Sequence, residues 1–198
     1  QKEIEKLSFK EQYLRGLCKL AHIEDCVEQW QHRAEQDIGL TEYLGLTGEE
    51  HKTFLCGGRD ALAALLEPQR RKQRFVLYQL QLDEENAIPF AFKDITALKA
   101  AGYEQPPAAM YYVAGSGEIY CPAEESDDTL LKRLFADCRE RLPEGCRGRP
   151  MAVSDVVELN HGAKRAYYYV SGQDQFRQVK FSPMLAKKEI PEKTQERF

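Results

Sequence analysis

Three residues near the start of the chain have side chains that bind soft metal ions. Cys18, His22 and Cys26 are each four positions apart, so one unbroken helix would place all three on a single face. Thiolate and imidazole groups together favour zinc and similar ions. Three ligands on one helix seldom converge on an ion, and residues 23–25 indicate a break in the helix. We therefore predict a core-facing stripe, with no metal and no cofactor, and keep the metal site as the alternative.

A second combination, Ser154 and Asp155 with His161, has the residue types of nucleophilic catalysis. His161 stands in the turn Asn160-His161-Gly162, and no neighbouring motif supplies an oxyanion loop. The short oxygens of Ser154 and Asp155 can instead accept backbone N–H bonds where the chain turns into a strand. We predict this structural role and no catalytic residue, and an enzyme remains the third function considered.

Aromatic and basic groups near the C-terminus could contact a partner. Strand alternation places Tyr167 and Tyr169 on one face and Tyr168 on the other. Arg177, on the next predicted strand, could add a basic group to such a surface. Because exposed tyrosine and arginine are frequent in binding hot spots, Tyr167, Tyr169 and Arg177 are candidate partner-binding residues. The alternative is that helices cover this face as ordinary core.

A basic run follows the helix-ending Pro68, and its members are Arg70, Arg71, Lys72 and Arg74. Such a run can contact nucleic acid or an acidic partner, and we keep its four residues as a second candidate surface. The run has no interleaved aromatic residues, which favours a solvated linker instead.

Composition limits the protein classes that fit. The chain has 198 residues, 42% of them hydrophobic, and a net charge of −4, so it does not attract DNA non-specifically. Its six cysteines include no Cys-x-x-Cys pair, which indicates reduced thiols. No stretch is long and apolar enough for a membrane span, and the charged start is unlike a secretory signal. These features predict a cytoplasmic protein without a membrane partner.

The N-terminal part is predicted to be helical. Ser8 to Glu11 and Thr47 to Glu50 are capping-box patterns, each of which begins a helix. Apolar spacing and Gly or Pro stops predict helices at 8–21, 23–34, 40–46, 49–56 and 60–66. The short Gly turn at Gly45 permits a DNA-reading helix-turn-helix, but acidic residues at the start of the following helix would repel phosphates. We predict a helical hairpin that packs on the β domain.

The C-terminal part alternates strands and helices. Strands are predicted at 75–82, 110–113, 118–120, 156–159, 166–170 and 176–181, with helices at 94–101 and 129–141. A turn at 114–117 would join the second and third strands into a hairpin, and a turn at 160–162 would join the fourth and fifth. The fold class is α+β, a helical N-terminal part followed by a small, mostly antiparallel sheet with two helices. The predicted organisation is a helical domain at 1–68, a basic linker at 69–74, an α+β domain at 75–183 and a polar tail at 184–198.

The segment GRPMAVSDVVEL, followed by a turn and AYYYV, resembles the signature of YodL-like domains. Gly148, Val153, Ser154 and Asp155 form the core of the match. The remaining matches are Val156, Val157, Tyr168 and Val170. The sequence departs from the pattern at Pro150 and in the turn at 171–176. The resemblance extends back to Arg74 and implies an α+β domain found in proteins of Firmicutes plasmids and conjugative elements, without a known activity.

The segment LTEYLGLTGEEHKTF also resembles a short motif of small Firmicutes mobile-element proteins. Together the two resemblances favour a non-enzymatic accessory protein of a mobile element that binds another macromolecule. A protein partner is expected, with the chain acting as an adaptor or as an inhibitor of a host defence or nucleic-acid enzyme. The alternative is a DNA-binding regulator that uses the helical half and Arg70–Arg74.

Overall fold

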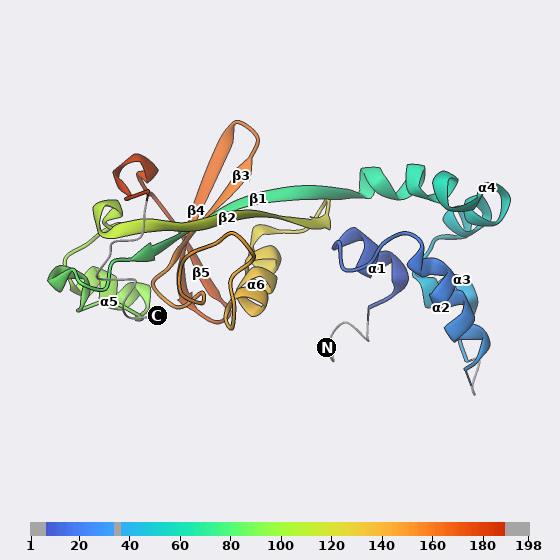
Figure 1. The fold of residues 1–198 in the computed structure, drawn as a ribbon, viewed down its shortest axis with the longest axis horizontal. Helices are drawn as coiled ribbons and strands as arrows, with labels where there is room; N and C mark the ends of the chain where they lie inside the picture. Colours follow the sequence, from blue (N-terminus) through green and yellow to red (C-terminus); the bar gives the residue numbers. More distant parts are fainter. Residues whose placement is uncertain (1–6, 34–36, 189–198) are drawn as a thin grey trace. The chain divides into compact units, whose positions relative to one another are not determined.

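The computed structural model describes residues 7–33 and 37–188 and confirms the α+β class (Figure 1). The α-helices are α1 (Phe9–Leu14), α2 (His22–Gln31), α3 (Leu40–Leu44), α4 (Gly48–Leu66), α5 (Ile95–Ala100) and α6 (Asp127–Cys138). The strands are β1 (Arg70–Leu80), β2 (Tyr111–Pro122), β3 (Val156–His161), β4 (Lys164–Gly172) and β5 (Gln175–Val179). Short 3₁₀ turns are η2 (Glu67–Gln69), η3 (Glu85–Ala87), η4 (Ala108–Met110) and η5 (Pro183–Leu185). Among the described helices, none is long and apolar enough to cross a membrane.

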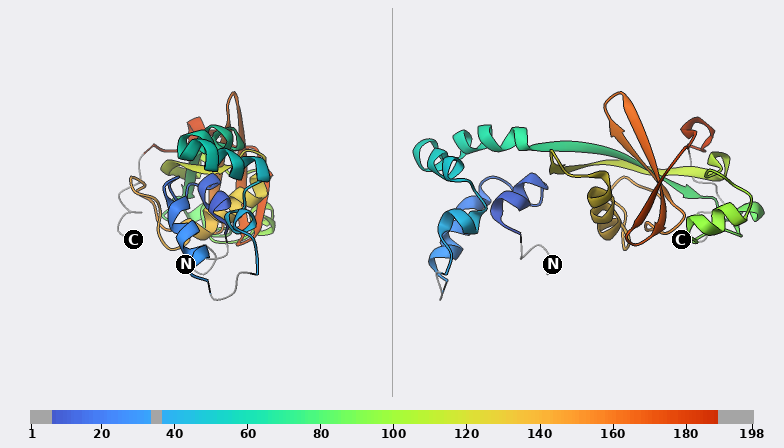
Figure 2. Two further views of the ribbon diagram at one scale, coloured as in Figure 1. Left: turned by 90° about the vertical axis from the view of Figure 1, so that its right-hand side faces the viewer. Right: turned by 180° about the vertical axis from the view of Figure 1, so that it is seen from behind.

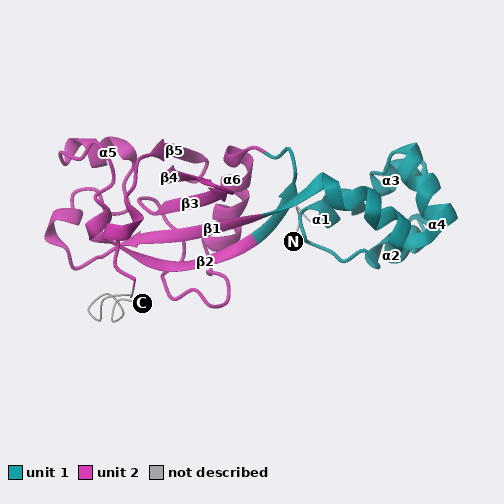
Figure 3. Cartoon of the chain, turned by 90° about the horizontal axis from the view of Figure 1, so that it is seen from above, with its two compact units in different colours: residues 1–72, 119–125 teal, residues 73–118, 126–198 magenta. Residues whose placement is uncertain are grey.

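The chain forms two compact units, and neither is continuous in sequence (Figure 3). Unit 1 comprises residues 1–72 and 119–125, and unit 2 comprises residues 73–118 and 126–198. The first division between the units, after residue 72, lies inside the segment 69–74 that was predicted as a linker. The sequence did not predict that residues 119–125 belong to unit 1, because this depends on contacts between distant segments.

Unit 1 contains α1 to α4, and both predicted capping boxes are present. The Ser8 hydroxyl accepts the N–H of Glu11, and Thr47 accepts that of Glu50. The prediction that the first helix continues to residue 21 is wrong, because α1 ends at Leu14 and Gly16 has a φ of 68°. A side chain at Gly16 would also approach the Tyr120 ring to within 2.9 Å, so this turn needs glycine.

A short turn joins α3 to α4. α3 ends at Gly45 with a φ of 73°, as its glycine cap predicted. The predicted stop at Gly57 and Gly58 is only a kink, since Gly58 has non-helical angles and α4 then continues to Leu66. Glu50 in the first turn of α4 is buried and pairs with Lys10 of α1 at 2.9 Å. The carboxylate therefore joins two helices within unit 1.

Unit 2 is built on the five-stranded sheet, whose strand order is β2-β1-β3-β4-β5 (Figure 1). The pairings of β1 with β3, β3 with β4 and β4 with β5 are all antiparallel. The predicted hairpin of β3 and β4 is confirmed, and its turn residue Gly162 has a φ of 71°. Figure 2 shows this hairpin (orange) from two further directions.

The two faces of the sheet pack against different elements of unit 2. On one face, Tyr169 and Val156 join a buried cluster that includes Leu98 of α5. On the opposite face, Phe176 meets Phe135 of α6, with ring centres 6.3 Å apart. The two predicted helices of this part therefore cover opposite faces, and each begins at a capping side chain, Asp94 for α5 and Ser126 for α6.

The predicted hairpin at 110–120 is wrong, because β2 runs without a turn from Tyr111 to Pro122. Its glycines permit close packing instead. An added Cβ at Gly115 would lie 2.8 Å from the Cα of Cys146, and one at Gly117 would lie 2.8 Å from the Phe75 ring. Local sequence cannot separate a glycine that turns from a glycine that makes room for a neighbour.

The predicted linker at 69–74 is also wrong. Residues 67–69 form η2, and β1 begins at Arg70. Gln73 and Phe75 are buried within β1, which shows that alternation extends into the basic run. Charged residues on the exposed side of a strand look like a solvated linker when only composition is considered.

Part of the predicted tail is ordered. Pro183–Leu185 form η5, and Lys187 adds to the edge of β2. Its N–H donates to the carbonyl of Tyr111 at 2.9 Å, and its carbonyl accepts the N–H of Val113 at 2.8 Å. The rest of the predicted tail, residues 189–198, lies outside the described residues.

We expect a fragment of residues 73–188 to fold without the rest of unit 1. It contains all described residues of unit 2, including the buried cluster beneath α5 and the contact of α6 with Phe176. Circular dichroism and thermal unfolding of the fragment should show a mixed α/β spectrum and one cooperative transition. A matched fragment of 82–188, which lacks β1, should not fold. Aggregation or a featureless spectrum of the 73–188 fragment would contradict this prediction.

Candidate functional site

The signature residue Asp155 lies in a buried network. Its side chain has no solvent exposure and accepts three hydrogen bonds. The donors are the guanidinium of Arg149 at 2.7 Å, the amide of Gln79 at 3.0 Å and the backbone N–H of Ala152 at 2.9 Å. The predicted turn cap is therefore present through Ala152, but it is only one of three bonds.

Gln79 of β1 connects this network to the sheet. Its amide also donates to the carbonyl of Arg149 at 2.9 Å, and its Oε1 accepts the N–H of Arg149 and the hydroxyl of Tyr112. Gly148 stands where an added Cβ would lie 2.6 Å from the side chain of Ala114 and would also clash with Gln79. Glycine at this position therefore lets the chain pass close to β1 and β2. Gln79 itself is fully buried.

Ser154 holds a second loop to the same place. It is buried with a φ of 78°, which is uncommon outside glycine. Its hydroxyl accepts the N–H of Phe92, whose φ is 61°, at 3.0 Å. Its carbonyl accepts the hydroxyl of Tyr111 at 2.8 Å. Two strained residues are thus held by bonds to each other and to β2, while Val153 beside them is half-buried.

Burial raises the pKa of Asp155 to about 6, although the Arg149 guanidinium and the hydrogen bonds oppose this shift. Arg149 is itself only 7% exposed, and its guanidinium lies 4.9 Å from the ring centre of Phe92. The network therefore contains an almost completely desolvated ion pair, whose integrity depends on every bond around it.

Comparison with known proteins gives one family match. The model of one protein family, described as the YodL-like domain, matches residues 74–181. The chain belongs to this family. The match begins within β1, at Arg74, and covers β2 to β5 together with α5 and α6. It therefore includes nearly all of the sheet of unit 2. No curated protein and no solved structure matches the chain.

In this YodL-like domain, the signature residues Gly148, Ser154 and Asp155 support the fold. Ser154 and His161 were considered together as a catalytic combination, but the structure does not bring them together. The ring of His161 lies 3.0 Å from a carboxylate oxygen of Asp127, whereas Ser154 bonds to Phe92 and Tyr111.

The Cys18, His22 and Cys26 stripe is also not formed. α1 ends at Leu14 and α2 begins at His22, so Cys18 lies between the two helices. His22 instead lies 3.2 Å from Asp25. Within residues 7–33 and 37–188, no group of three His, Cys, Asp or Glu side chains could hold a metal ion.

The tyrosine prediction needs a correction. Tyr169 is completely buried, and its hydroxyl donates to the carbonyl of Lys93 at 2.8 Å, so it cannot contact a partner. Tyr167 is half-buried and packs on Phe181, while Arg177 is exposed. The cluster that includes Leu98 of α5 thus covers the end of the tyrosine face at Tyr169, whereas the end at Tyr167 is only partly covered.

The residues of the basic run also differ in their exposure and contacts. Arg70 lies between the rings of Tyr13 and Tyr120, 4.2 Å from each ring centre, and pairs with Glu67 at 2.8 Å. Arg71 donates to the carbonyls of residues 123 and 125, which belong to the same unit. Lys72 and Arg74 remain exposed. Lys72 nevertheless lies 5.4 Å from the ring centre of Tyr120, and Arg74 pairs with Glu118 at 3.5 Å.

We predict that Arg70→Ala lowers the free energy of unfolding by about 1–3 kcal/mol, since it removes two cation–π contacts and the packing of the long side chain. Lys52→Ala, an exposed cation on α4, is the control and should change stability by less than about 0.5 kcal/mol. Urea unfolding measures both changes. Equal effects of the two substitutions would contradict a structural role for Arg70.

The open end of the tyrosine face contains a hollow of about 470 Å³. Its floor is Glu158, a carboxylate of β3 that is only 4% exposed and accepts the hydroxyl of Tyr78 at 3.2 Å. Arg74 and Arg165 also line it, with 73% and 56% of their side chains exposed; Arg74 pairs with Glu118 at 3.5 Å and Arg165 with Glu158 at 4.0 Å. Sequence reasoning missed Glu158, although a glutamate between Val157 and Leu159 in an apolar strand is itself an unusual signal.

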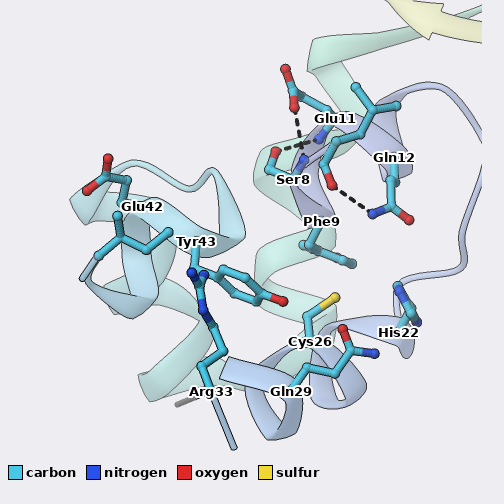
Figure 4. A pocket seen from close by; sticks show the side chains of 12 residues that line it. Ser8, Phe9, Glu11, Gln12, His22, Cys26, Gln29, Arg33, Glu42 and Tyr43 are labelled. Atoms are coloured by element: carbon cyan, nitrogen blue, oxygen red, sulfur yellow. Dashed lines mark hydrogen bonds between the residues drawn. The ribbon is translucent and has the colours of Figure 1, made fainter. Parts of the chain in front are cut away.

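A second hollow, of about 580 Å³, lies within unit 1 (Figure 4). Its polar side chains mostly bond to one another or to the adjoining backbone. Glu11 bonds to the Ser8 N–H, Gln12 to the Leu7 carbonyl, and Arg33 lies over the Tyr43 ring. The polar groups of this hollow are thus largely satisfied by unit 1 itself.

Proposed function

We propose that this YodL-like protein is a cytoplasmic accessory protein of a mobile genetic element that binds another protein without catalysing a reaction. It would act as an adaptor, or as an inhibitor of a host defence or nucleic-acid enzyme. The mobile-element context follows from the two sequence resemblances. The binding role is supported by the open end of the sheet in unit 2.

The single observation that supports binding best is the group of exposed cations on this sheet. Arg74 and Arg165 surround a hollow with a buried carboxylate, and Tyr167 of the neighbouring strand is half-buried. Arginine beside tyrosine, over a partly desolvated floor, is the composition of a binding hot spot. The signature network around Asp155 would then serve to hold the strands that present these groups.

The test is affinity capture from host cells, followed by binding measurements with the purified partner. The double variant Arg74→Gln and Arg165→Gln should weaken binding by about 10-fold or more, since both charges lie at the rim of the site. Lys52→Gln, an exposed cation on α4, is the matched control and should leave affinity unchanged. Melting temperatures of all variants separate an effect on binding from a loss of stability caused by breaking the pair of Arg165 with the buried Glu158.

The same preparation distinguishes a protein partner from DNA. Binding to DNA would weaken steeply with salt, because each neutralised phosphate releases counterions. Capture of nucleic acid alone, with that salt dependence, would favour the DNA-binding regulator. Failure of the double variant to change affinity for a captured protein would exclude the open end of the sheet as the binding site.

A further inference from the structure

Within residues 7–33 and 37–188, β5 is the last strand of the sheet, and one of its two edges pairs with another strand, β4. The hydrogen bonds of Val170 identify which backbone groups face outward. Its N–H donates to the carbonyl of Asp155 at 2.9 Å, and its carbonyl accepts the N–H of Ser154 at 2.8 Å. The backbone N–H and carbonyl of Val170 therefore point toward the β3 side of β4. Because these groups alternate along a strand, those of Tyr169 and Tyr167 point toward β5.

The register of β4 and β5 then assigns the free edge. Tyr169 stands opposite Arg177, and Tyr167 opposite Val179, so the backbone groups of Arg177 and Val179 point inward. Those of Phe176 and Gln178 point outward. The next outward N–H, that of Lys180, donates to the side chain of Gln105 at 2.8 Å, which agrees with this direction and closes that end of the edge.

The side chains along this edge are mainly polar and basic. Gln175, Arg177, Gln178 and Lys180 are exposed, and Phe176 is half-buried against α6. Arg177 points to the tyrosine face, while Lys180 alternates to the other face. A new strand at this edge would thus have a cation on each side, in a chain whose net charge is −4.

We propose that β5 takes up an extended acidic segment of a protein partner as a sixth strand. This inference rests on the proposed function and specifies how the partner binds. Backbone bonds to Phe176 and Gln178 would hold the segment, and carboxylates beside Arg177 and Lys180 would select it, as in other cases of strand addition. The edge is short because Gln105 occupies its end, which fits a segment of a few residues rather than a long strand.

A second copy of this chain fits the edge less well. In a symmetric antiparallel pair of two β5 strands, Phe176 of each copy would bond to Gln178 of the other. The centre of this pair is Arg177. This pairing places Arg177 directly opposite its equivalent, and like charges in that position destabilise strand pairs. An isolated acidic strand avoids this repulsion and gains opposite-charge pairs instead.

The test uses the full chain and three capped hexapeptides. The first alternates glutamate with valine, the second alternates lysine with valine, and the third is the glutamate peptide with every second amide methylated. Amide chemical shifts and hydrogen exchange in the protein report where each peptide binds. We expect the glutamate peptide to protect the N–H groups of Phe176 and Gln178 and to bind about 10-fold or more tightly than the lysine peptide.

In an extended peptide, alternate amides point to the same edge, so the methylated peptide has one blocked edge. It should lose binding in every register that uses this edge, and this test requires no change to the protein. Gln178→Pro should likewise remove binding of the glutamate peptide, whereas Gln178→Ala, which keeps the N–H, should not. Equal binding of both charged peptides, or protection elsewhere, would overturn the proposal. Dimerisation through β5 in sedimentation experiments would overturn it in favour of a second copy.

The experiments distinguish a failure of strand addition at β5 from a failure of the proposed function. If a captured partner binds the Gln178→Pro variant normally, strand addition is excluded while protein binding stands. If the chain captures no protein at all, the proposed function fails, and peptide binding at β5 would then carry no biological role.

Discussion

Asp155→Ala is expected to lower the free energy of unfolding by about 3–5 kcal/mol, because it leaves the charge of Arg149 buried without its partner. The substitution also removes acceptors from Gln79 and from the N–H of Ala152. Loss of a turn cap alone would cost only about 1 kcal/mol. Urea unfolding at neutral pH measures the difference as a lower midpoint.

Asp128→Ala is the matched control, since Asp128 pairs with Lys132 on the surface of α6 at 2.8 Å. An exposed pair of this kind contributes about 1 kcal/mol or less. If Asp155→Ala left the unfolding midpoint unchanged but removed partner binding, Asp155 would be a functional residue and not a structural one.

The raised pKa of Asp155 gives the sign of a pH effect. The folded state holds the proton up to about pH 6, whereas the ordinary pKa is 3.8, so between these values the folded state binds more protons. This group's contribution to stability therefore falls as pH rises from about 4 to 6. Asp155→Asn should lack that fall, and the difference between the two pH profiles isolates it.

Tyr169→Ala is expected to cost about 3–5 kcal/mol, as for other fully buried aromatic side chains. The ring belongs to the cluster beneath α5, so truncation leaves a cavity that the sheet cannot close. Thermal and urea unfolding should both show the loss.

Tyr169→Phe separates the ring from its hydroxyl. The variant keeps the packing and loses only the bond to the carbonyl of Lys93, so we expect a cost of about 0.5–1.5 kcal/mol. Normal stability of Tyr169→Ala, combined with weaker partner binding, would instead restore Tyr169 to the binding surface.

The sequence by itself determined the local features of the chain. Both capping boxes, the glycine that ends α3 and the hairpin of β3 and β4 were predicted, because each depends on side chains within a few residues of one another. The two helices of unit 2 were predicted for the same reason, from a cap and an apolar stripe. These signals were enough to define the α+β class.

The sequence also pointed to Gly148, Ser154 and Asp155, but not to their partners. Asp155 bonds to Gln79, which is 76 positions away, and Ser154 bonds to Phe92, which is 62 positions away. A buried glutamine in an alternating strand has the same sequence pattern as an exposed one, so only packing on both faces of the sheet showed that Gln79 is core.

Tertiary structure alone decided which of the basic and aromatic side chains are buried and which are exposed. Arg70 is held between two tyrosines, while Arg74 in the same strand is exposed, although their charges and local sequence are alike. Tyr169 is core and Tyr167 is half-exposed, although alternation places them on one face. The physical reason is common to both cases: alternation fixes the face on which a side chain stands, and distant segments determine how much of that face is covered.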